Sequence, residues 1–431
     1  MPLPEDLSLF DENRHTGLRF GFLTTFYPPY NFGGDGIGVQ RLSRGLVRAG
    51  HRVTVVHDVD AYEALAPGPP PPASPEPDGL EVVSLRSGAG VLSPLLTHQA
   101  GRPIINARRI RQLLATRSFD VITYHNISLL GGPGLYAYGD AVKLHMAHEH
   151  WLVCPTHVLW RHGREVCTGR QCFRCQLHYR RPPQWWRWTG LLERNLHHVD
   201  RFIAMSEFSR AKHMEFGFPR EMDVLPYFLP DDREAVEDTS PTTPPQSRPY
   251  FIFVGRLELI KGLQDVLPLF EGEGAADLVV AGDGEYGATL RAMAGHNPRI
   301  RFLGRVGSDE LGEWYRGATA LLVPSLCFET FGIILLEAFR QSTPVIARRL
   351  GPLPELIESS GGGMLFGDRG ELAAAMARLL QDPAFRATLA RSGRAALDAL
   401  WSERTVVPRY LDIVRSAAAD RGNARVLSLL S

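Results

Sequence analysis

The order of elements at the start of the chain constrains its fold more than any other feature. Residues 18–25 (LRFGFLTT) form a short apolar run that predicts a strand, and residues 27–38 are rich in Gly and Pro. Apolar residues then recur at helical spacing over 39–47, and a second apolar run follows at 52–56. Such a βαβ unit implies a right-handed crossover and a parallel sheet, so we predict an α/β fold.

Further strands are predicted in the first half at 80–85, 119–124, 141–146, 200–205 and 223–225. The proline-rich segment 66–77 cannot join a sheet, and we interpret it as a mobile surface insertion. Ser206 is expected to cap a helix. His125 and His148 follow two of the strands, at the sheet edge where open α/β proteins bind ligands. A structural role is the alternative for each histidine, and we prefer it for His125.

A second α/β half follows a polar, proline-rich segment. Its strands are predicted at 250–254, 278–281, 300–303, 319–323 and 344–347. Helices are expected after Lys261-Gly262, at 309–315, over 370–397 and at 402–419, with a turn at 361–363. The predicted organisation is a tail at 1–17, a Rossmann-like domain at 18–229, a linker at 230–249, a second Rossmann-like domain at 250–401 and a C-terminal segment at 402–431.

The composition argues against several classes of function. The 431 residues include 47 Lys and Arg and 47 Asp and Glu, so nothing attracts the whole chain to nucleic acid. The N-terminus has neither the basic nor the apolar region of a signal peptide, and no apolar run is long enough to cross a membrane. We therefore expect a cytoplasmic protein without a nucleic-acid partner, with peripheral contact to the inner face of the membrane left open.

Four of the five cysteines lie in one segment, 151–180, which we interpret as an insertion. Cys154, Cys167, Cys172 and Cys175 supply the four thiolates of a closed tetrahedral zinc site. Their spacing lacks the paired C-x2-C layout of typical zinc sites, so an iron–sulfur cluster and metal-free thiols remain alternatives. Any metal held here would be structural.

A stretch rich in Arg and Trp follows at 180–198 (RRPPQWWRWTGLLERNLHH). Interleaved Trp and Arg are found at membrane interfaces and at sites for anionic ligands. The alternative, which we prefer, is a solvated basic face whose Trp side chains pack into the core.

The stretch 323–339 (VPSLCFETFGIILLEAF) ends a strand, forms a short loop and begins a helix that is apolar nearly all round. Glu337 lies inside this helix, where burial of an unpaired carboxylate is costly. It either pairs with a structural Arg or reaches solvent, or it accepts hydrogen bonds from ligand hydroxyl groups. Glu329 stands in the preceding loop, and the backbone N–H groups of residues 330–332 would face a phosphate.

Two cations are expected at the same edge of the second sheet. Arg256 and Lys261 follow the strand at 250–254, and the loop of Glu329 lies at that edge. Cations and a helix N-terminus suit a diphosphate, and carboxylates suit sugar hydroxyl groups. Together they predict a site for a nucleoside diphosphate sugar, where the cations stabilise the charge of the leaving diphosphate without a metal ion.

The motifs resemble those of the retaining glycosyltransferases of the GT-B fold, family four. GRLELIKG (255–262) is similar to the family's G-R-x-x-x-x-K-G motif, and ETFGIILLE (329–337) is similar to its two-glutamate motif. The segment 31–56 resembles the family's N-terminal glycine loop and helix, and AHEHWLVCP (147–155) its H-D-x-W segment, with Glu149 in place of Asp. The resemblance implies two Rossmann-like domains facing a cleft, with a C-terminal helix that crosses back to the N-terminal domain.

The resemblance also implies roles for individual residues. Arg256 and Lys261 would hold the diphosphate, and His148 would touch the sugar near the reacting carbon. Glu329 would contact the transferred sugar, and Glu337 would bind the ribose hydroxyl groups. The further donor-binding positions that it implies are Gly33, Gly34, Gly304, Arg305, Thr330, Phe331 and Gly332. Ser342, where a glycine is common, and GPLPE (351–355), which replaces the usual double glycine before P-E, depart from the family pattern.

The implied reaction is transfer of a sugar, with retention and without a required cofactor, from a nucleoside diphosphate sugar to a hydroxyl group of a sugar, lipid or small-molecule acceptor. The diphosphate would depart from the front face, and the leaving phosphate itself would take the acceptor's proton. No side-chain nucleophile is proposed. The alternatives are another GT-B enzyme, such as a nucleotide-sugar epimerase or a phosphorylase, and a non-catalytic sugar-nucleotide sensor that binds a partner through a zinc knuckle.

Overall fold

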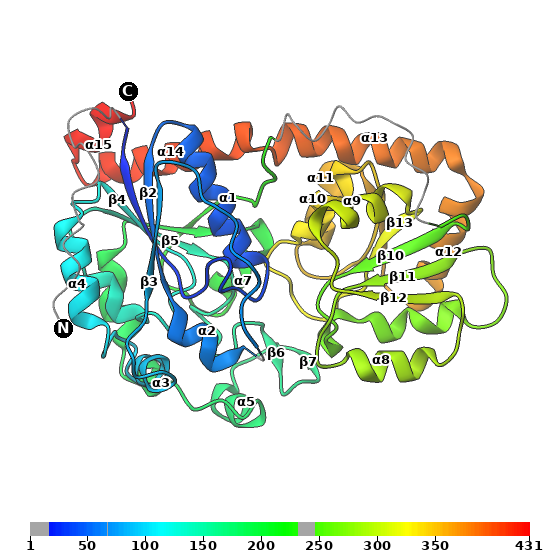
Figure 1. Ribbon diagram of the computed structural model, residues 1–431, viewed down its shortest axis with the longest axis horizontal. Helices are drawn as coiled ribbons and strands as arrows, with labels where there is room; N and C mark the ends of the chain where they lie inside the picture. The colour runs from blue at the N-terminus through cyan, green and yellow to red at the C-terminus, as the bar shows by residue number, and fades with distance from the viewer. Residues whose placement is uncertain (1–16, 67, 232–245) are drawn as a thin grey trace. The chain divides into compact units, whose positions relative to one another are not determined.

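The computed structural model describes residues 17–66, 68–231 and 246–431, so nearly all of the predicted tail and most of the predicted linker lie outside the described residues. Two sheets of parallel strands organise these residues (Figure 1). By contacts, the chain divides into two compact units. One comprises Met1–His145, Arg194–Asp200 and Leu411–Ser431, and the other Met146–Glu193 and Arg201–Tyr410.

The first sheet has seven strands in the order β3-β2-β1-β4-β5-β8-β9. Its strands are β1 (Arg19–Leu23), β2 (Arg52–Asp58), β3 (Leu80–Leu85), β4 (Val121–Tyr124), β5 (Val142–Ala147), β8 (Arg201–Ala204) and β9 (Met222–Val224). Every strand predicted for the first half is therefore confirmed to within a few residues. The strand order reverses beside β1, which is the place where ligands bind in open α/β sheets.

The helices of the first unit follow from the apolar pattern. Helix α1 (Gly34–Arg48) buries Val39, Leu42 and Leu46, the periodic residues that predict it. The other helices before β5 are α2 (Val59–Leu65), α3 (Leu92–Ala100) and α4 (Ala107–Thr116). The central strands are buried on both faces, as a parallel sheet covered by helices requires.

The second sheet has six strands in the order β12-β11-β10-β13-β14-β15. Its strands are β10 (Tyr250–Val254), β11 (Asp277–Ala281), β12 (Ile300–Gly304), β13 (Ala320–Val323), β14 (Val345–Arg348) and β15 (Gly363–Phe366). The accompanying helices are α8 (Gly287–Ala294), α9 (Ser308–Gly317), α10 (Ile333–Arg340), α11 (Leu353–Ser360), α12 (Arg369–Gln381) and α13 (Pro383–Leu400). A core that includes Phe251, Leu278 and Leu322 lies against one face of this sheet.

One prediction for the second half is wrong. No regular helix follows Gly262, because this glycine is left-handed, with φ 74°, and Pro268 cannot donate a backbone hydrogen bond. Three short 3-10 segments stand there instead: Leu259–Lys261, Leu263–Asp265 and Leu267–Phe270. Residues 370–397 are helical, as expected, and they form two helices, since Asp382 caps a new one before Pro383. The turn at 361–363 leads directly into strand β15, which we did not predict.

The proline-rich segment 66–77 is not a mobile insertion throughout its length. At its C-terminal end the carboxylate of Glu76 accepts hydrogen bonds from Tyr27 Oη at 3.1 Å, Gln40 Nε2 at 2.7 Å and Arg44 Nε at 2.7 Å. Gln40 and Arg44 lie on α1, so these bonds tie the segment to that helix.

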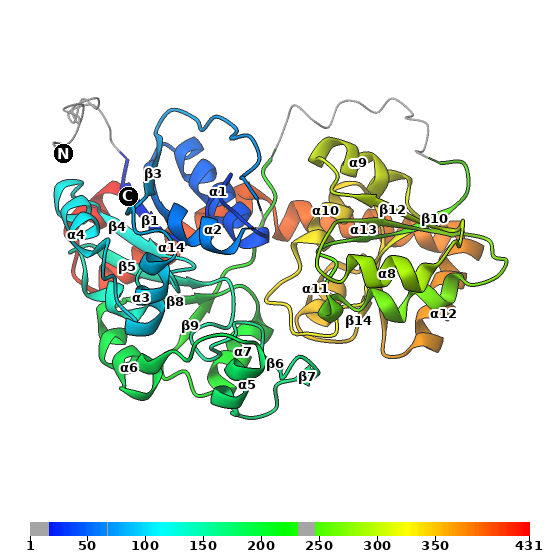
Figure 2. The same ribbon diagram turned by 60° about the horizontal axis from the view of Figure 1, so that its bottom comes forward.

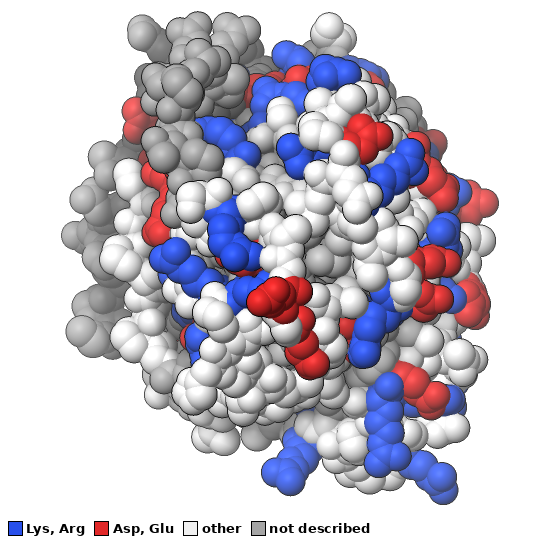
Figure 3. All heavy atoms as spheres, turned by 90° about the vertical axis from the view of Figure 1, so that its right-hand side faces the viewer, with Lys and Arg blue, Asp and Glu red and all other residues white. Residues whose placement is uncertain are grey.

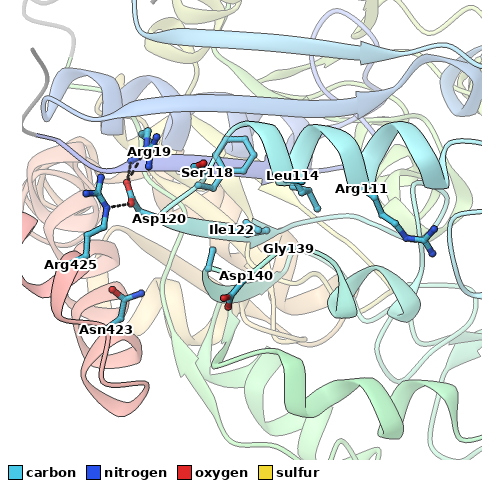
Figure 4. Close-up of a pocket in the computed structure, with 13 residues that line it drawn as sticks. Arg19, Arg111, Leu114, Ser118, Asp120, Ile122, Gly139, Asp140, Asn423 and Arg425 are labelled. Carbon is cyan, nitrogen blue, oxygen red and sulfur yellow. Dashed lines mark hydrogen bonds and ion pairs between the residues drawn. The ribbon is translucent and has the colours of Figure 1, made fainter. Parts of the chain in front are cut away.

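The C-terminal helices α14 (Glu403–Asp420) and α15 (Ala424–Leu429) return to the first unit, as predicted. Arg421 forms ion pairs with Asp140 and Asp200. Arg425 Nε lies 2.8 Å from Asp120, which also contacts Arg19 (Figure 4). The C-terminal helices are thus bound to residues that precede β4, β5 and β8.

Candidate active site

The carboxyl ends of three strands in the second sheet are joined through their glycines. The backbone N–H of Gly255, after β10, donates to Ala281, and the N–H of Gly282, after β11, donates to Gly304 at 2.7 Å. Gly282 has φ 137°, and a Cβ there would lie 1.9 Å from the oxygen of Gly255. Only glycine permits this approach, which aligns the loops after β10, β11 and β12.

The two sequence motifs of the second half meet at a second glycine contact. A Cβ on Gly262 would lie 2.0 Å from the oxygen of Pro324, and the backbone N–H of Leu326 donates to Ile260 at 2.8 Å. GRLELIKG (255–262) and the loop before ETFGIILLE (329–337) are therefore side by side, as the sequence predicts.

Lys261 and Glu329 form an ion pair in this contact. Lys261 Nζ lies 2.6 Å from Glu329 Oε1, and both side chains are less than one quarter exposed, at 21% and 23%. Ser325 Oγ donates to the same oxygen at 2.9 Å. Burial lowers the pKa of Lys261, but the nearby Glu329 carboxylate raises it above its usual value. Burial raises the pKa of Glu329, but Lys261, Ser325 and Arg256 bring it below its usual value, so both groups carry charge.

Arg256 stands closer to solvent at the same edge. Its side chain is 56% exposed, and Nη1 lies 2.7 Å from Glu258 Oε1. Because the pair is exposed, little energy holds the guanidinium to Glu258. Arg256 can therefore turn to a phosphate bound beside Lys261.

Helix α10 begins beside this ion pair. Gly332 precedes it with φ 123°, and a Cβ there would lie 3.3 Å from the Leu335 and Leu353 side chains. The glycine lets the chain turn into the helix, so the helix N-terminus follows directly after the Glu329 loop. Glu337, on α10, is half-buried, and Tyr315 Oη donates to it at 3.5 Å. Burial, and then the Glu337 carboxylate, raise the pKa of Tyr315.

His148 is connected to the Glu329 loop. It directly follows β5, is 6% exposed, and its Nδ1 lies 2.5 Å from Tyr227 Oη. Thr330 Oγ1 donates to the backbone oxygen of His148 at 2.8 Å, and Ser206 Oγ donates to the oxygen of Thr330 at 2.8 Å. Ser206 also caps α7 (Glu207–Glu215), as predicted.

Tyr227 is a site residue that sequence reasoning missed. Its ring packs edge to face on Phe331, with centroids 5.8 Å apart, while its hydroxyl reaches His148. It lies in an irregular segment after β9 and belongs to no motif, so no local signal could identify it. Glu149, which stands for the family's Asp, forms an ion pair with His157 Nδ1 at 2.7 Å.

The remaining predicted residues are not joined to the Lys261–Glu329 pair by the contacts described above. Gly304 ends β12 with φ 76°, and Arg305 after it is exposed. Gly33 and Gly34 lie at the start of α1 after β1, in the first unit, and the structure does not place that unit against the site in the second. His125 is buried and packs edge to face on Phe22, which agrees with the structural role we preferred.

The cysteine segment forms a small hairpin and a helix. Strands β6 (Trp160–Arg161) and β7 (Glu165–Val166) pair before α5 (Cys172–His178), and the backbone N–H of His162 donates to Cys175 Sγ at 3.4 Å. No cysteine among the described residues is in a disulfide. In residues 17–66, 68–231 and 246–431, no three His, Cys, Asp or Glu side chains are arranged to hold a metal ion. The metal site therefore gains no support here and stays a prediction.

The Arg- and Trp-rich stretch is divided between core and surface. Trp186 is 4% exposed, and Arg187 stacks on its ring at 4.5 Å while donating to the Trp151 oxygen at 2.5 Å. Burial lowers the pKa of Arg187 to about 10. Trp185 and Trp188 are 57% and 54% exposed. The preferred core packing is thus correct for Trp186 only.

A cavity of about 520 Å³ lies in the first unit, at the amino ends of β4 and β5 (Figure 4). Its buried carboxylate, Asp120, is satisfied by Arg19 and Arg425. The cavity opens at the edge opposite to the carboxyl ends of the strands, where ligands bind in such sheets. Its charges hold the C-terminal helices, and none of the predicted donor-binding residues lines it.

Two parallel α/β sheets, with cations and carboxylates at the carboxyl edge of the second, are the arrangement expected of a GT-B glycosyltransferase. Residues 32–233 match the family model described as Glycosyltransferase Family 4, and residues 248–382 match the model described as Glycosyl transferases group 1. These matches cover well over half of the chain, which belongs to this glycosyltransferase family. They do not favour the epimerase, phosphorylase or sensor alternatives.

Individual glycosyltransferases are also similar to this chain in sequence. A GDP-mannose-dependent monoacylated alpha-(1-6)-phosphatidylinositol monomannoside mannosyltransferase of Corynebacterium glutamicum is 30% identical over 201 residues, which are 43% of this chain and 52% of that protein. The chain thus spans about half the length of this relative. A glycogen synthase of Mycobacterium tuberculosis is 26% identical over 94% of this chain and 96% of that protein.

A solved structure agrees with the fold. Sucrose-phosphate synthase from Thermosynechococcus elongatus superposes with a TM-score of 0.70 over 94% of this chain and 100% of that chain. At 19% sequence identity this similarity supports the GT-B fold and no finer property.

Proposed function

We propose that the protein transfers a sugar from a nucleoside diphosphate sugar to an acceptor hydroxyl group, with retention at the anomeric carbon and without a catalytic metal ion. The observation that carries the proposal is the charged Lys261–Glu329 pair beside the N-terminus of α10. A diphosphate fits this place because a cation and unpaired helix N–H groups both attract it.

The chemistry follows from the charges. Lys261 and Arg256 stabilise the negative charge that builds on the diphosphate as its bond to the anomeric carbon breaks. The acceptor oxygen forms the new bond on the same face, and its proton passes to the leaving phosphate. Glu337 accepts hydrogen bonds from the ribose, and Glu329 and His148 contact the sugar. Side chains thus position the donor and stabilise the leaving group, and none acts as nucleophile.

Turnover of a donor tests the proposal. A thermal-shift screen of UDP, GDP and ADP sugars identifies the donor, since a ligand that binds only the folded state raises its stability. Transfer is then measured as release of the nucleoside diphosphate in the presence of sugar, lipid and small-molecule acceptors. Lys261→Ala should lower kcat by about 100- to 1,000-fold, because one charge-stabilising donor is lost.

Arg391→Ala, on the exposed side of α13, is the matched control and should keep full activity. A folded Lys261→Ala variant with unchanged turnover would contradict the proposed role of the pair. Epimerised donor or phosphate-dependent cleavage, in place of transfer, would assign one of the alternative GT-B reactions.

Retention and metal independence need separate measurements. The anomeric configuration of the product, followed by NMR from the first turnover, should equal that of the donor. Chelation with EDTA should leave the rate unchanged. An inverted product or a rate that requires added divalent metal would remove that part of the proposal.

Membrane contact belongs to the same set of proposals, because a lipid is one of the acceptor classes. Trp185 and Trp188 are the exposed residues of the Arg- and Trp-rich stretch that could make it. Their replacement by Ser is therefore included in the vesicle experiment below.

A further inference from the structure

Helix α3 buries two of its polar residues and exposes its three leucines. Ser93 and Thr97 are 1% and 4% exposed, whereas Leu92, Leu95 and Leu96 are 58%, 39% and 42% exposed. A helix on a soluble surface has the opposite arrangement. Burial of the polar side therefore leaves a row of leucines on the outside of the unit.

The orientation of α3 is held by specific contacts. Asn106, 6% exposed, directs Nδ2 to Ser93 Oγ at 3.4 Å, so the polar face is bonded to the segment that precedes α4. Helix α2 packs against α3, and α3 lies nearer the edge of the molecule in Figure 1, while Figure 2 shows the two helices side by side. The outward leucines are thus a consequence of packing within the unit.

Further apolar side chains are exposed on both sides of α3. Val91, before the helix, is 59% exposed, and Ile104 and Ile105, after it, are each 39% exposed. Scattered exposed apolar side chains are ordinary, but Leu92, Leu95 and Leu96 are three and four residues apart and share one helix face, and a contiguous group of this kind marks an interaction site. We call the six side chains and the arginines beside them the α3 surface, made of Val91, Leu92, Leu95, Leu96, Ile104, Ile105, Arg102, Arg108 and Arg109.

The charge of this region is of one sign. No Asp or Glu occurs between Ser87 and Phe119. Arg102, Arg108 and Arg109 are exposed, and among the described residues none of them is paired with a carboxylate. Over most of the face shown in Figure 3, by contrast, basic and acidic side chains are intermingled. A chain of zero net charge therefore concentrates unpaired cations next to exposed leucines.

We propose that the α3 surface docks on an anionic lipid bilayer. Apolar side chains flanked by arginines match both parts of such a bilayer, because the leucines enter the acyl boundary and the guanidinium groups remain at the phosphates. A protein partner would need acidic groups at each arginine, whereas anionic lipids supply them at any orientation. Contact would be peripheral, since no helix among the described residues is long and apolar enough to span a membrane.

Flotation with vesicles tests this surface, independently of glycosyl transfer. Wild-type protein should float with phosphatidylcholine vesicles that contain phosphatidylglycerol, and less with phosphatidylcholine alone. Leu95→Asn with Leu96→Asn should lower the partition constant by about tenfold or more. Arg108→Glu with Arg109→Glu should lower it at least about fivefold for each arginine, and added salt should weaken wild-type binding.

Matched controls carry the same changes elsewhere. Met293→Asn, at a side chain 51% exposed on α8, and Arg391→Glu, on α13, should float like wild type. Because α3 is outside the donor site, the leucine variant should also retain wild-type circular dichroism and turnover with a soluble acceptor.

Three results would overturn the proposal. Wild-type protein that does not float with anionic vesicles has no such surface. Flotation that persists in the folded leucine variant and is lost only with Trp185→Ser and Trp188→Ser would assign the contact to the Arg- and Trp-rich stretch. A wild-type dimer in solution that the leucine variant converts to monomer would make a second copy of the chain the occupant.

Discussion

Lys261 and Glu329 form an ion pair inside the loop contact where we propose that the donor's diphosphate binds. Ser325 adds a third group to the same carboxylate oxygen. A bound phosphate would therefore compete with Glu329 for Lys261, and the carboxylate it displaces would be free to accept a sugar hydroxyl group. This exchange lets one pair hold the empty loop in place and also contact the donor.

The stability that this pair supplies should depend on pH. The pKa of Glu329 is below its ordinary 4.5, so its contribution is present above that value and is lost as pH falls through the lowered pKa. The pKa of Lys261 is above its ordinary 10.5, so its contribution is present below that value and is lost as pH rises through the raised pKa. In urea unfolding, Glu329→Gln should thus be less stable than wild type at neutral pH and equal to it at strongly acidic pH.

Glu313→Gln is the control for this measurement, since its ion pair with Arg316 is exposed. It should change the free energy of unfolding by less than about 1 kcal/mol at any pH. A deficit of Glu329→Gln that stays constant from neutral to acidic pH would show that charge is not its cause.

Tyr227 should act as a positioning residue for His148. Tyr227→Phe removes the hydroxyl that contacts His148 Nδ1 and keeps the ring on Phe331. We expect kcat to fall by about tenfold or more with little change in the donor KM, because the imidazole loses its fixed orientation. Tyr250→Phe removes a buried hydroxyl that bonds Trp314 instead, and should not lower kcat. Equal losses in both variants would indicate a general effect on stability.

At the scale of elements, glycines determine how closely the motif loops approach. Gly262→Ala places a Cβ 2.0 Å from the Pro324 oxygen at a left-handed position with φ 74°. We expect a loss of about 1–3 kcal/mol in the free energy of unfolding, measured with urea, and a lower kcat, because the Pro324 loop must move. Gly68→Ala, with no atom within 4 Å of its Cβ, should be neutral. If the two variants are equally stable, the contact is not rigid.

The segment with the four cysteines leads to a prediction about metal content. If the thiols bind zinc, elemental analysis should find about one zinc per chain, and Cys172→Ser should lose it, since a structural site needs all four ligands. One to several irons with visible absorbance would indicate the cluster alternative. Protein with neither metal would mean that these residues are thiols without a metal.

Helices and strands were predicted correctly where neighbouring residues alone determine them. Apolar runs such as 250–254 became buried strands, and Ser206 became a cap, because strand burial and capping depend on neighbouring residues. The helix expected after Lys261-Gly262 failed because a contact with Pro324, distant in sequence, requires the left-handed glycine. The outward leucines of α3 could not be predicted either, since apolar residues at helical spacing ordinarily face inward.

At the scale of the molecule, the C-terminal helices complete the first unit through buried charge. Asp120 is 3% exposed at its side chain and lies between Arg19 and Arg425. Recognition of the family predicted this return of the chain. The particular carboxylate could not be predicted, because residues separated by about three hundred positions determine it.

Replacement of Arg425 tests how much the ion pairs of Asp120 stabilise the first unit. Arg425→Ala leaves the buried Asp120 with Arg19 and one fewer hydrogen bond, so we expect a loss of about 1–3 kcal/mol in the free energy of unfolding. Arg415→Ala breaks an exposed pair with Asp412 on α14 and should cost less than about 1 kcal/mol. Equal effects of the two changes would show that the Asp120 cluster contributes no more than a surface pair.

Because residues 411–431 belong to the first unit, that unit cannot be completed until these residues have been synthesised. The first 145 residues leave the ribosome early, but their partner helices emerge only after the 265 intervening residues have been made. At roughly 5–20 residues per second, this delay is on the order of 10 to 50 s. During that interval Asp120 lacks Arg425, and Asp140 and Asp200 lack Arg421. The nascent first unit must therefore wait for the end of the chain, and a truncated product would expose an incomplete N-terminal half.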